Sequence, residues 1–92
     1  MKPFRWNAEK NQIIAAERGV NFEQMTIAIE DGGILDILQH PNVEKYPNQK
    51  IFVVEFNDYV YMIPFVEEDD CYFLKTVIPS RKATRDYLKK GD

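Results

Sequence analysis

A run of basic residues near the end of the chain could bind a polyanion. Arg81, Lys82 and Arg85 follow Ser80 closely. The planar guanidinium of arginine matches two oxygens of a phosphate, whereas a lysine amine transfers protons only where nearby cations or burial disfavour its charged form. In a helix that begins after Ser80, Arg81 and Arg85 lie four apart on one face and Lys82 points elsewhere. The run indicates a phosphate-binding face, although a solvated helix with no ligand fits the same pattern.

Three other side chains could take part in binding. His40 is the only histidine, the residue type that changes charge near neutral pH, and it stands before Pro41 at the expected end of a strand. A surface or turn role is the simpler interpretation of that position. Tyr59 and Tyr61 alternate along an expected strand and therefore share one face. They could stack on nucleic-acid bases or pack beneath a helix.

Charge is distributed unevenly along the sequence. Residues 75–92 hold six basic and two acidic residues, a net charge of +4. Residues 1–74 hold six basic and thirteen acidic residues, a net charge of −7. A basic end can meet a polyanion and an acidic flank can meet a basic partner protein, so the overall charge of −3 does not exclude either.

Composition favours a single globular domain spanning residues 1–92. Apolar residues make up 45% of the chain and charged residues 29%, values that exclude a disordered protein. A core of this size cannot also enclose a deep substrate cavity. We therefore expect any active site to be a shallow groove on a sheet face.

Cysteine content and the N-terminal sequence favour a cytoplasmic location. Cys71 is alone, which excludes an internal disulfide and a cysteine-based zinc site. The N-terminal stretch lacks the pattern of a signal peptide, and no apolar run is long enough to cross a membrane. We expect a protein that stays in the cytoplasm and makes no membrane contact.

The acidic run Glu67-Glu68-Asp69-Asp70 is the one segment rich enough in carboxylates to raise the question of a metal site. Adjacent residues of an extended chain point to alternate faces, so these carboxylates do not converge without help. We expect a solubilising hairpin tip here, and neither a metal ion nor a cofactor.

A first helix is expected over residues 8–18. Asn7 is a favourable N-cap, and Gly19 stands just past the end, where a left-handed residue commonly closes a helix. Ile13 and Ile14 are expected to face inward.

Two more helices are expected. Asn21 caps one over residues 22–30, whose apolar positions fall on one face. Pro79 ends the preceding strand, and Ser80 caps a last helix over 81–90.

A short strand precedes the helices, and four longer ones follow the second helix, the last four joined by tight turns. The expected ranges are 4–6, 34–40, 50–56, 59–66 and 71–78. This order predicts an α+β fold with two N-terminal helices, a four-stranded mainly antiparallel sheet and a C-terminal helix. Helices should cover one face of the sheet, leaving the opposite face open unless a ligand or partner covers it.

Three segments resemble the BrnT family of bacterial toxins. They are Phe4-Arg5-Trp6-Asn7-Ala8-Glu9-Lys10-Asn11, similar to an opening Trp-Asp/Asn-x-x-Lys-Asn; Arg18-Gly19-Val20-Asn21-Phe22-Glu23, similar to His-Gly-Val-x-Phe; and Ser80-Arg81-Lys82-Ala83-Thr84-Arg85, close to Ser-Ala-Arg-Lys-Ala-Thr. Their order and spacing agree over nearly the whole chain.

The resemblance implies a fold like that of the RelE ribonucleases and cleavage of RNA that blocks translation. It also implies a cognate antitoxin with a ribbon-helix-helix or similar DNA-binding end, in a heterotetramer where two toxins flank an antitoxin dimer. DNA would then be contacted only through the antitoxin.

Metal-free RNA cleavage needs a base for the 2′-hydroxyl, an acid for the leaving 5′-oxygen, and cations for the charge that develops on the phosphoryl oxygens. The candidates by residue type and resemblance are, for catalysis, Lys10, Arg18, Arg81 and Arg85, and for RNA contact, Lys82, Tyr59, Tyr61 and His40.

The sequence also departs from the family pattern. Arg18 stands where the family usually has histidine, Ile14 replaces an asparagine of many members, and Tyr87 stands near the place of a common acidic residue. Two other functions therefore stay open: a toxin-like module that binds a partner without cleaving RNA, and a non-catalytic accessory protein that contacts DNA.

Overall fold

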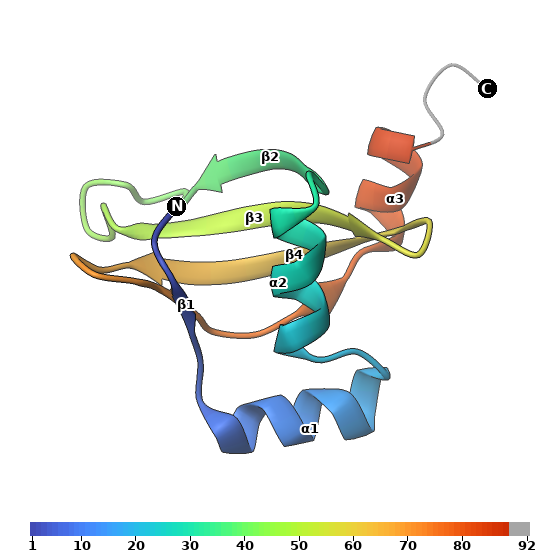
Figure 1. Ribbon diagram of the computed structural model, residues 1–92. Helices are drawn as coiled ribbons and strands as arrows, with labels where there is room; N and C mark the ends of the chain where they lie inside the picture. Colours follow the sequence, from blue (N-terminus) through green and yellow to red (C-terminus); the bar gives the residue numbers. More distant parts are fainter. Residues whose placement is uncertain (89–92) are drawn as a thin grey trace.

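The computed structural model describes residues 1–88 and has the α+β architecture that the sequence predicts. Figure 1 shows helices around a twisted sheet. In chain order the elements are β1 (Phe4–Arg5), α1 (Ala8–Arg18), α2 (Phe22–Glu30), β2 (Ile34–Gln39), β3 (Gln49–Phe56), β4 (Tyr59–Glu67), β5 (Tyr72–Leu74), β6 (Ile78–Pro79) and α3 (Arg81–Leu88). The last two residues of the helix expected over 81–90 lie outside the described part of the chain.

The caps place α1 and α2 where the sequence predicts them. The Asn7 side chain accepts a hydrogen bond from the Lys10 N–H at 2.9 Å, and Gly19 adopts a left-handed φ of +72°. Asn21 and Gln24 form a reciprocal capping box at the start of α2. The expectation for Ile13 is wrong, since its side chain is 48% exposed and only its neighbour on α1 is buried. Consecutive residues of a helix point about 100° apart, and α1 buries too narrow a stripe to hold both.

The expected four-stranded sheet is wrong in detail, because the sheet formed by residues 1–88 has six strands and mixed pairing. The strand order is β1-β5-β4-β3-β2, and β6 pairs separately with β4. The short N-terminal strand β1 joins the sheet by parallel pairing with β5, Phe4 lying opposite Tyr72. The other pairings are antiparallel.

The strand expected over 71–78 is interrupted, and Pro64 explains where. Its carbonyl accepts the Lys75 N–H at 2.8 Å, so its own backbone nitrogen faces the same neighbour and has no hydrogen to donate. The pairing register then shifts by one residue, from Phe65 opposite Leu74 to Met62 opposite Ile78. Two short strands, β5 and β6, result.

One face of the sheet, here called the α2 face, carries the main core. Phe52 of β3 stacks on Phe65 of β4, with ring centroids 3.9 Å apart. Side chains of α1, α2 and the loop between them complete this core, namely Ile14, Val20, Phe22, Met25 and Ile29. Burial of these apolar groups supplies the principal driving force for folding.

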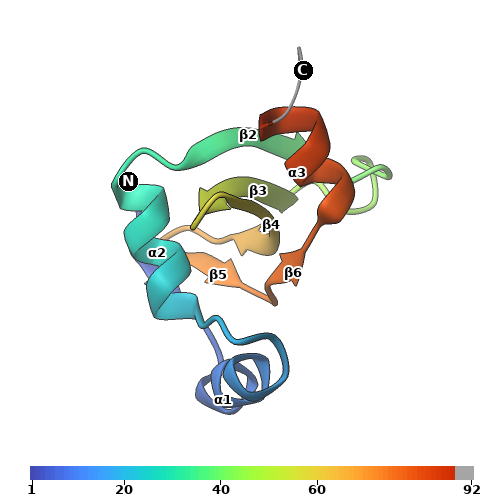
Figure 2. The ribbon, with the colours of Figure 1, turned by 90° about the vertical axis from the view of Figure 1, so that its right-hand side faces the viewer.

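The opposite face, here called the α3 face, is not left open as expected. Alternation along the paired strands places Leu38, Ile51, Val53, Val60, Met62 and Pro64 on it. Val53 and Val60 have no exposed surface and do not belong to the main core cluster, because α3 packs over this end of the face. Figure 2 shows α2 and α3 on the two sides of the strands. The rest of the α3 face is only half-buried.

Candidate functional site

A pocket of about 460 Å³ lies where the β3–β4 turn meets α3. Its lining residues are one aromatic, two basic, one acidic and one hydroxyl-bearing residue, namely Tyr59, Arg81, Arg85, Asp58 and Thr84. We call it the Tyr59 pocket. Three residues named from the sequence, Tyr59, Arg81 and Arg85, therefore meet at one place although the tyrosine is more than twenty residues away in the chain.

The turn before β4 fixes the position of Tyr59. Asn57 and Asp58 have φ values of +53° and +60°, the left-handed pair of a tight two-residue hairpin. Asparagine and aspartate tolerate that region better than other side chains. The hairpin begins β4 at Tyr59, whose ring packs edge-on against that of Tyr61 at 5.6 Å.

The first turn of α3 fixes the two arginines. Ser80 caps it, its hydroxyl oxygen accepting the Ala83 N–H at 3.0 Å. Arg81 and Arg85 lie one helical turn apart and both line the pocket, as the spacing predicts. Arg85 forms an exposed ion pair with Asp86 at 3.4 Å, a contact of little energetic weight in water. Among residues 1–88, no carboxylate forms an ion pair with Arg81.

Lys82 and Tyr61 lie outside the pocket lining. Lys82 borders a different hollow, of about 280 Å³, between α3 and the α3 face, together with Leu38 and Met62. Tyr61 packs against the main core and places its ring 6.2 Å from that of Phe56. Its surroundings match the packing interpretation rather than base stacking.

Lys10 and Arg18 also lie apart from the Tyr59 pocket. Both are on α1, which Figures 1 and 2 place at the far end of the molecule from α3. The Arg18 guanidinium donates to the Thr76 hydroxyl at 3.1 Å and to the Val77 carbonyl. This residue thus ties the end of α1 to the segment that leads into β6. Neither residue can therefore act together with Arg81 and Arg85 in the Tyr59 pocket as the structure stands.

His40 borders a groove at the other end of the α3 face. Its Nδ1 accepts the Asn42 N–H at 3.0 Å, so a neutral ring carries its hydrogen on Nε2. The Tyr46 ring lies against it at 4.5 Å. The groove measures about 340 Å³, with Ile51, Pro64 and Val66 among its apolar residues and Lys75 at its edge. The histidine and the two arginines therefore belong to different sites.

Sequence reasoning missed Asp58 and Thr84 as pocket residues. Thr84 stands only within the motif Ser80–Arg85, and no sequence pattern marks Asp58 as a site residue. The spacing of Thr84, four after Ser80 and three after Arg81, could have placed it near the same helix face.

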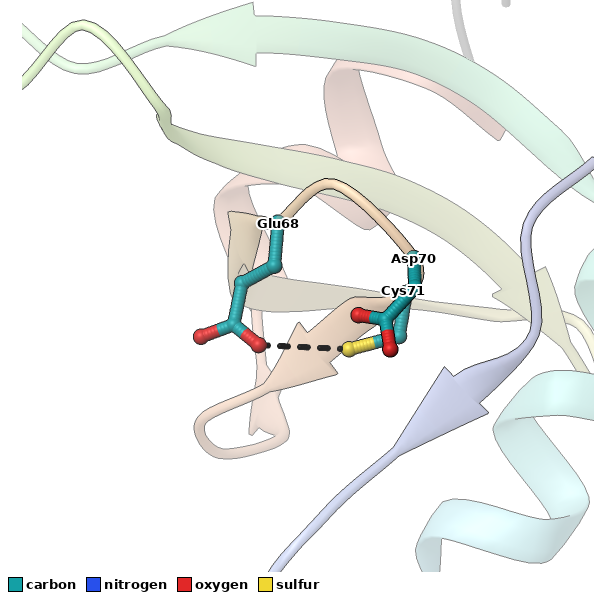
Figure 3. Close-up of side chains that lie close together, drawn as sticks. All are labelled: Glu68, Asp70 and Cys71. Atoms are coloured by element: carbon teal, nitrogen blue, oxygen red, sulfur yellow. Dashed lines mark hydrogen bonds between the residues drawn. The ribbon is translucent and has the colours of Figure 1, made fainter.

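Figure 3 shows the turn between β4 and β5, where Glu68, Asp70 and Cys71 come together. One donor atom from each lies within 4.8 Å of the other two. The backbone reverses here, the Glu68 N–H donating to the Cys71 carbonyl at 2.9 Å, so the alternation expected of an extended chain does not apply. The Cys71 thiol donates to Glu68 Oε1 at 3.4 Å. Burial and this hydrogen bond raise the pKa of Cys71, which opposes the thiolate form that metal binding needs.

Comparison with protein-family models, with curated proteins and with solved structures found no match to this chain. Within residues 1–88, every helix is too short or too polar to span a membrane.

Proposed function

We propose that the protein binds single-stranded RNA in the Tyr59 pocket and cleaves it, as a BrnT-like toxin of a toxin–antitoxin pair. The observation that carries the proposal is the convergence of Tyr59 with Arg81 and Arg85 around one pocket. Two guanidinium groups can hold a phosphate by paired hydrogen bonds, and the phenol ring offers a surface for a base.

The chemistry would be transfer of the phosphoryl group from the 5′-oxygen to the neighbouring 2′-hydroxyl. Arg81 and Arg85 would stabilise the negative charge that develops on the phosphoryl oxygens. Among the residues that line the pocket, Asp58 carries a carboxylate that can accept a proton and Tyr59 a hydroxyl that can donate one. This proposed mechanism uses no metal ion, because the arginine side chains supply the positive charge that stabilises the phosphoryl oxygens.

The biological context follows from the resemblance and is part of the proposal. A RelE-like fold, a cytoplasmic location and inhibition of translation belong to it. So does a heterotetramer with a DNA-binding antitoxin. The three motifs on which it rests cover β1 with the first turn of α1, the α1–α2 joint and the first turn of α3.

The test measures RNA binding and cleavage in EDTA by the purified protein and by a variant with Arg81→Ala and Arg85→Ala. The double variant should bind a short single-stranded RNA at least about tenfold more weakly, because charged hydrogen bonds are worth about 1.5–3 kcal/mol each. It should also lose both cleavage and growth arrest in cells that lack the antitoxin.

A matched control removes the same charge elsewhere. Lys45→Ala with Lys75→Ala takes away two exposed cations outside the Tyr59 pocket. If this control weakens RNA binding as much as the arginine variant does, the pocket is not the binding site. Unaffected growth with good yield of wild-type protein would contradict the toxin assignment.

A second candidate, a partner-binding domain that does not cleave RNA, is favoured by a separate observation. The uncovered part of the α3 face is apolar, with half-buried Leu38, Ile51, Met62, Pro64 and Val66. A polar RNA backbone gains little from such a surface, whereas a protein segment can bury it. Antitoxin binding in a protein without RNA cleavage would support this alternative.

A further inference from the structure

Both backbone groups of one β4 residue, Val60, are hydrogen-bonded to the start of α3, one to its cap residue Ser80 and one to Thr84. The Val60 carbonyl accepts the Ser80 N–H at 3.0 Å, and the Val60 N–H donates to the Thr84 hydroxyl oxygen at 2.9 Å. Thr84 in turn donates that hydroxyl to the Ser80 carbonyl at 2.7 Å. We call these three hydrogen bonds the Val60 clamp.

The clamp is buried, so water does not compete for it. Val60 has no exposed surface, and Thr84 is 6% exposed. Thr84 is also the one buried polar side chain among the described residues, all of whose fully buried side-chain polar atoms are hydrogen-bonded. A polar group in that position must be paired to be tolerated.

Each residue of the clamp adjoins a residue of the pocket in sequence. Val60 follows Tyr59, Ser80 precedes Arg81 and Thr84 precedes Arg85. The hydrogen bonds therefore join the backbone that carries the aromatic ring directly to the backbone that carries the two guanidinium groups.

Thr84 is not required to form the helix. The Ser80 hydroxyl already caps the first turn, and the Thr84 N–H already bonds to the Ser80 carbonyl as in any helix. The far end of α3 is held separately, by the hydrogen bond from the Tyr87 hydroxyl to Asp36 at 3.0 Å. What the Thr84 hydroxyl adds is a fixed docking position of this first turn against β4.

We infer that Thr84 is a positioning residue, whose hydroxyl holds Arg81 and Arg85 at a fixed distance and angle from Tyr59 so that the three grip one nucleotide. The inference rests on the proposed function of the pocket. Without the hydroxyl, α3 keeps its cap and its Tyr87 anchor, but its first turn is free to shift away from Val60. Both arginines then leave their common alignment.

The experiment compares three substitutions of Thr84 for affinity to a short single-stranded RNA. Thr84→Val keeps the shape and removes the acceptor, Thr84→Ala leaves room for a water molecule at the Val60 amide, and Thr84→Ser keeps the hydroxyl. Valine and alanine should each weaken RNA binding by about fivefold or more, because they misalign charged hydrogen bonds, while serine should restore affinity to within about twofold of wild type. Hydrogen exchange at the Val60 amide should be faster in the first two and slow in the third.

A stability control separates positioning from general loosening. Ile63→Val removes one methyl group from the fully buried α2 face and leaves the clamp intact. It should lower the melting temperature without changing RNA affinity. The RNA affinity of Thr84→Ala still tests the inference if the Thr84→Val protein does not fold.

The outcomes distinguish failure of this inference from failure of the proposed RNA binding in the Tyr59 pocket. If the Arg81→Ala and Arg85→Ala protein binds RNA as wild type does, the proposed function fails and the inference fails with it. If that protein loses affinity but Thr84→Ala and Thr84→Val do not, only the inference is overturned. Equal weakening by Thr84→Ser, or by Ile63→Val, would also overturn it.

Discussion

Gly33 is the residue whose lack of a side chain matters most to the packing of α2 on the sheet. A Cβ atom there would lie 2.7 Å from the Ala28 carbonyl oxygen and 2.9 Å from that of Glu55. Both are backbone atoms that cannot rotate away, and the Gly33 N–H and C=O are bonded to these same two residues.

We expect Gly33→Ala to lower the free energy of unfolding by about 1–3 kcal/mol, because the added methyl group forces the backbone apart. Gly19→Ala is the control. A Cβ atom added at Gly19 meets no atom within 4 Å, but the residue has a left-handed φ. The substitution should therefore lower the free energy of unfolding by about 1–2 kcal/mol. Urea denaturation of the two variants measures both values. A Gly33→Ala protein as stable as wild type would show that the close approach is relaxed in solution.

Single residues also show what sequence could and could not predict about the site. Arg81 and Arg85 were identifiable because they are four residues apart. This spacing is one turn of a helix, so the sequence alone shows that the two side chains share a face. The role of Arg18 was not, since its acceptors on Thr76 and Val77 lie almost sixty residues further along the chain. A charged side chain carries no local sign of whether it will bind a ligand or a distant carbonyl.

Among the elements, α3 is held at its far end by a bond that should respond to pH. The hydrogen bond from Tyr87 to Asp36 raises the pKa of the tyrosine, and partial burial and the nearby Asp36 and Asp86 charges act in the same direction. A phenol with a raised pKa in the folded state adds stability that is complete below its ordinary value near 10.0 and is lost as pH rises through the folded-state value.

The melting temperature should therefore fall as pH rises from about 9 to about 11, and Tyr87→Phe should remove part of that fall. The phenylalanine keeps the ring and loses only the hydroxyl that titrates. The other tyrosines remain as an internal reference. Identical pH profiles for the two proteins would mean that the bond to Asp36 does not contribute in solution.

Elements with local signals were predicted to the residue, and elements with remote partners were not. α1 and α2 begin after asparagine caps and end where expected, because the caps that define them are within the same short segment. The separation of β5 from β6 depends on Pro64, which lies in another strand. The packing of α3 on the second sheet face depends on Val53 and Val60, which alternation alone does not assign to a helix partner.

For the whole molecule, the proposal predicts how RNA binding depends on salt. The chain as a whole carries a net charge of −3, so long-range attraction contributes little and the local arginine contacts dominate. One phosphate of a single strand, held by both arginines, gives a slope of about −0.7 in log affinity against log salt concentration.

Arg81→Ala together with Arg85→Ala should bring that slope close to zero. Lys45→Ala, in the exposed loop between β2 and β3, should leave it unchanged. Filter-binding or anisotropy titrations at several salt concentrations measure both slopes. A slope near zero in the wild-type protein would mean that phosphate is not bound at all.

The parallel pairing of β1 with β5 has a consequence for how the protein is made. Phe4 and Arg5 find their places only beside Tyr72 and Phe73, with the Pro3 carbonyl accepting the Tyr72 N–H at 2.9 Å. A chain still attached to the ribosome cannot close this pair until most of its length has emerged from the exit tunnel. β1 is thus synthesised well before its partner strand and completes its pairing late, and contacts of such long sequence separation slow folding. Until β5 has been synthesised, the ring of Phe4 lacks the contact with Tyr72 that it has in the folded protein.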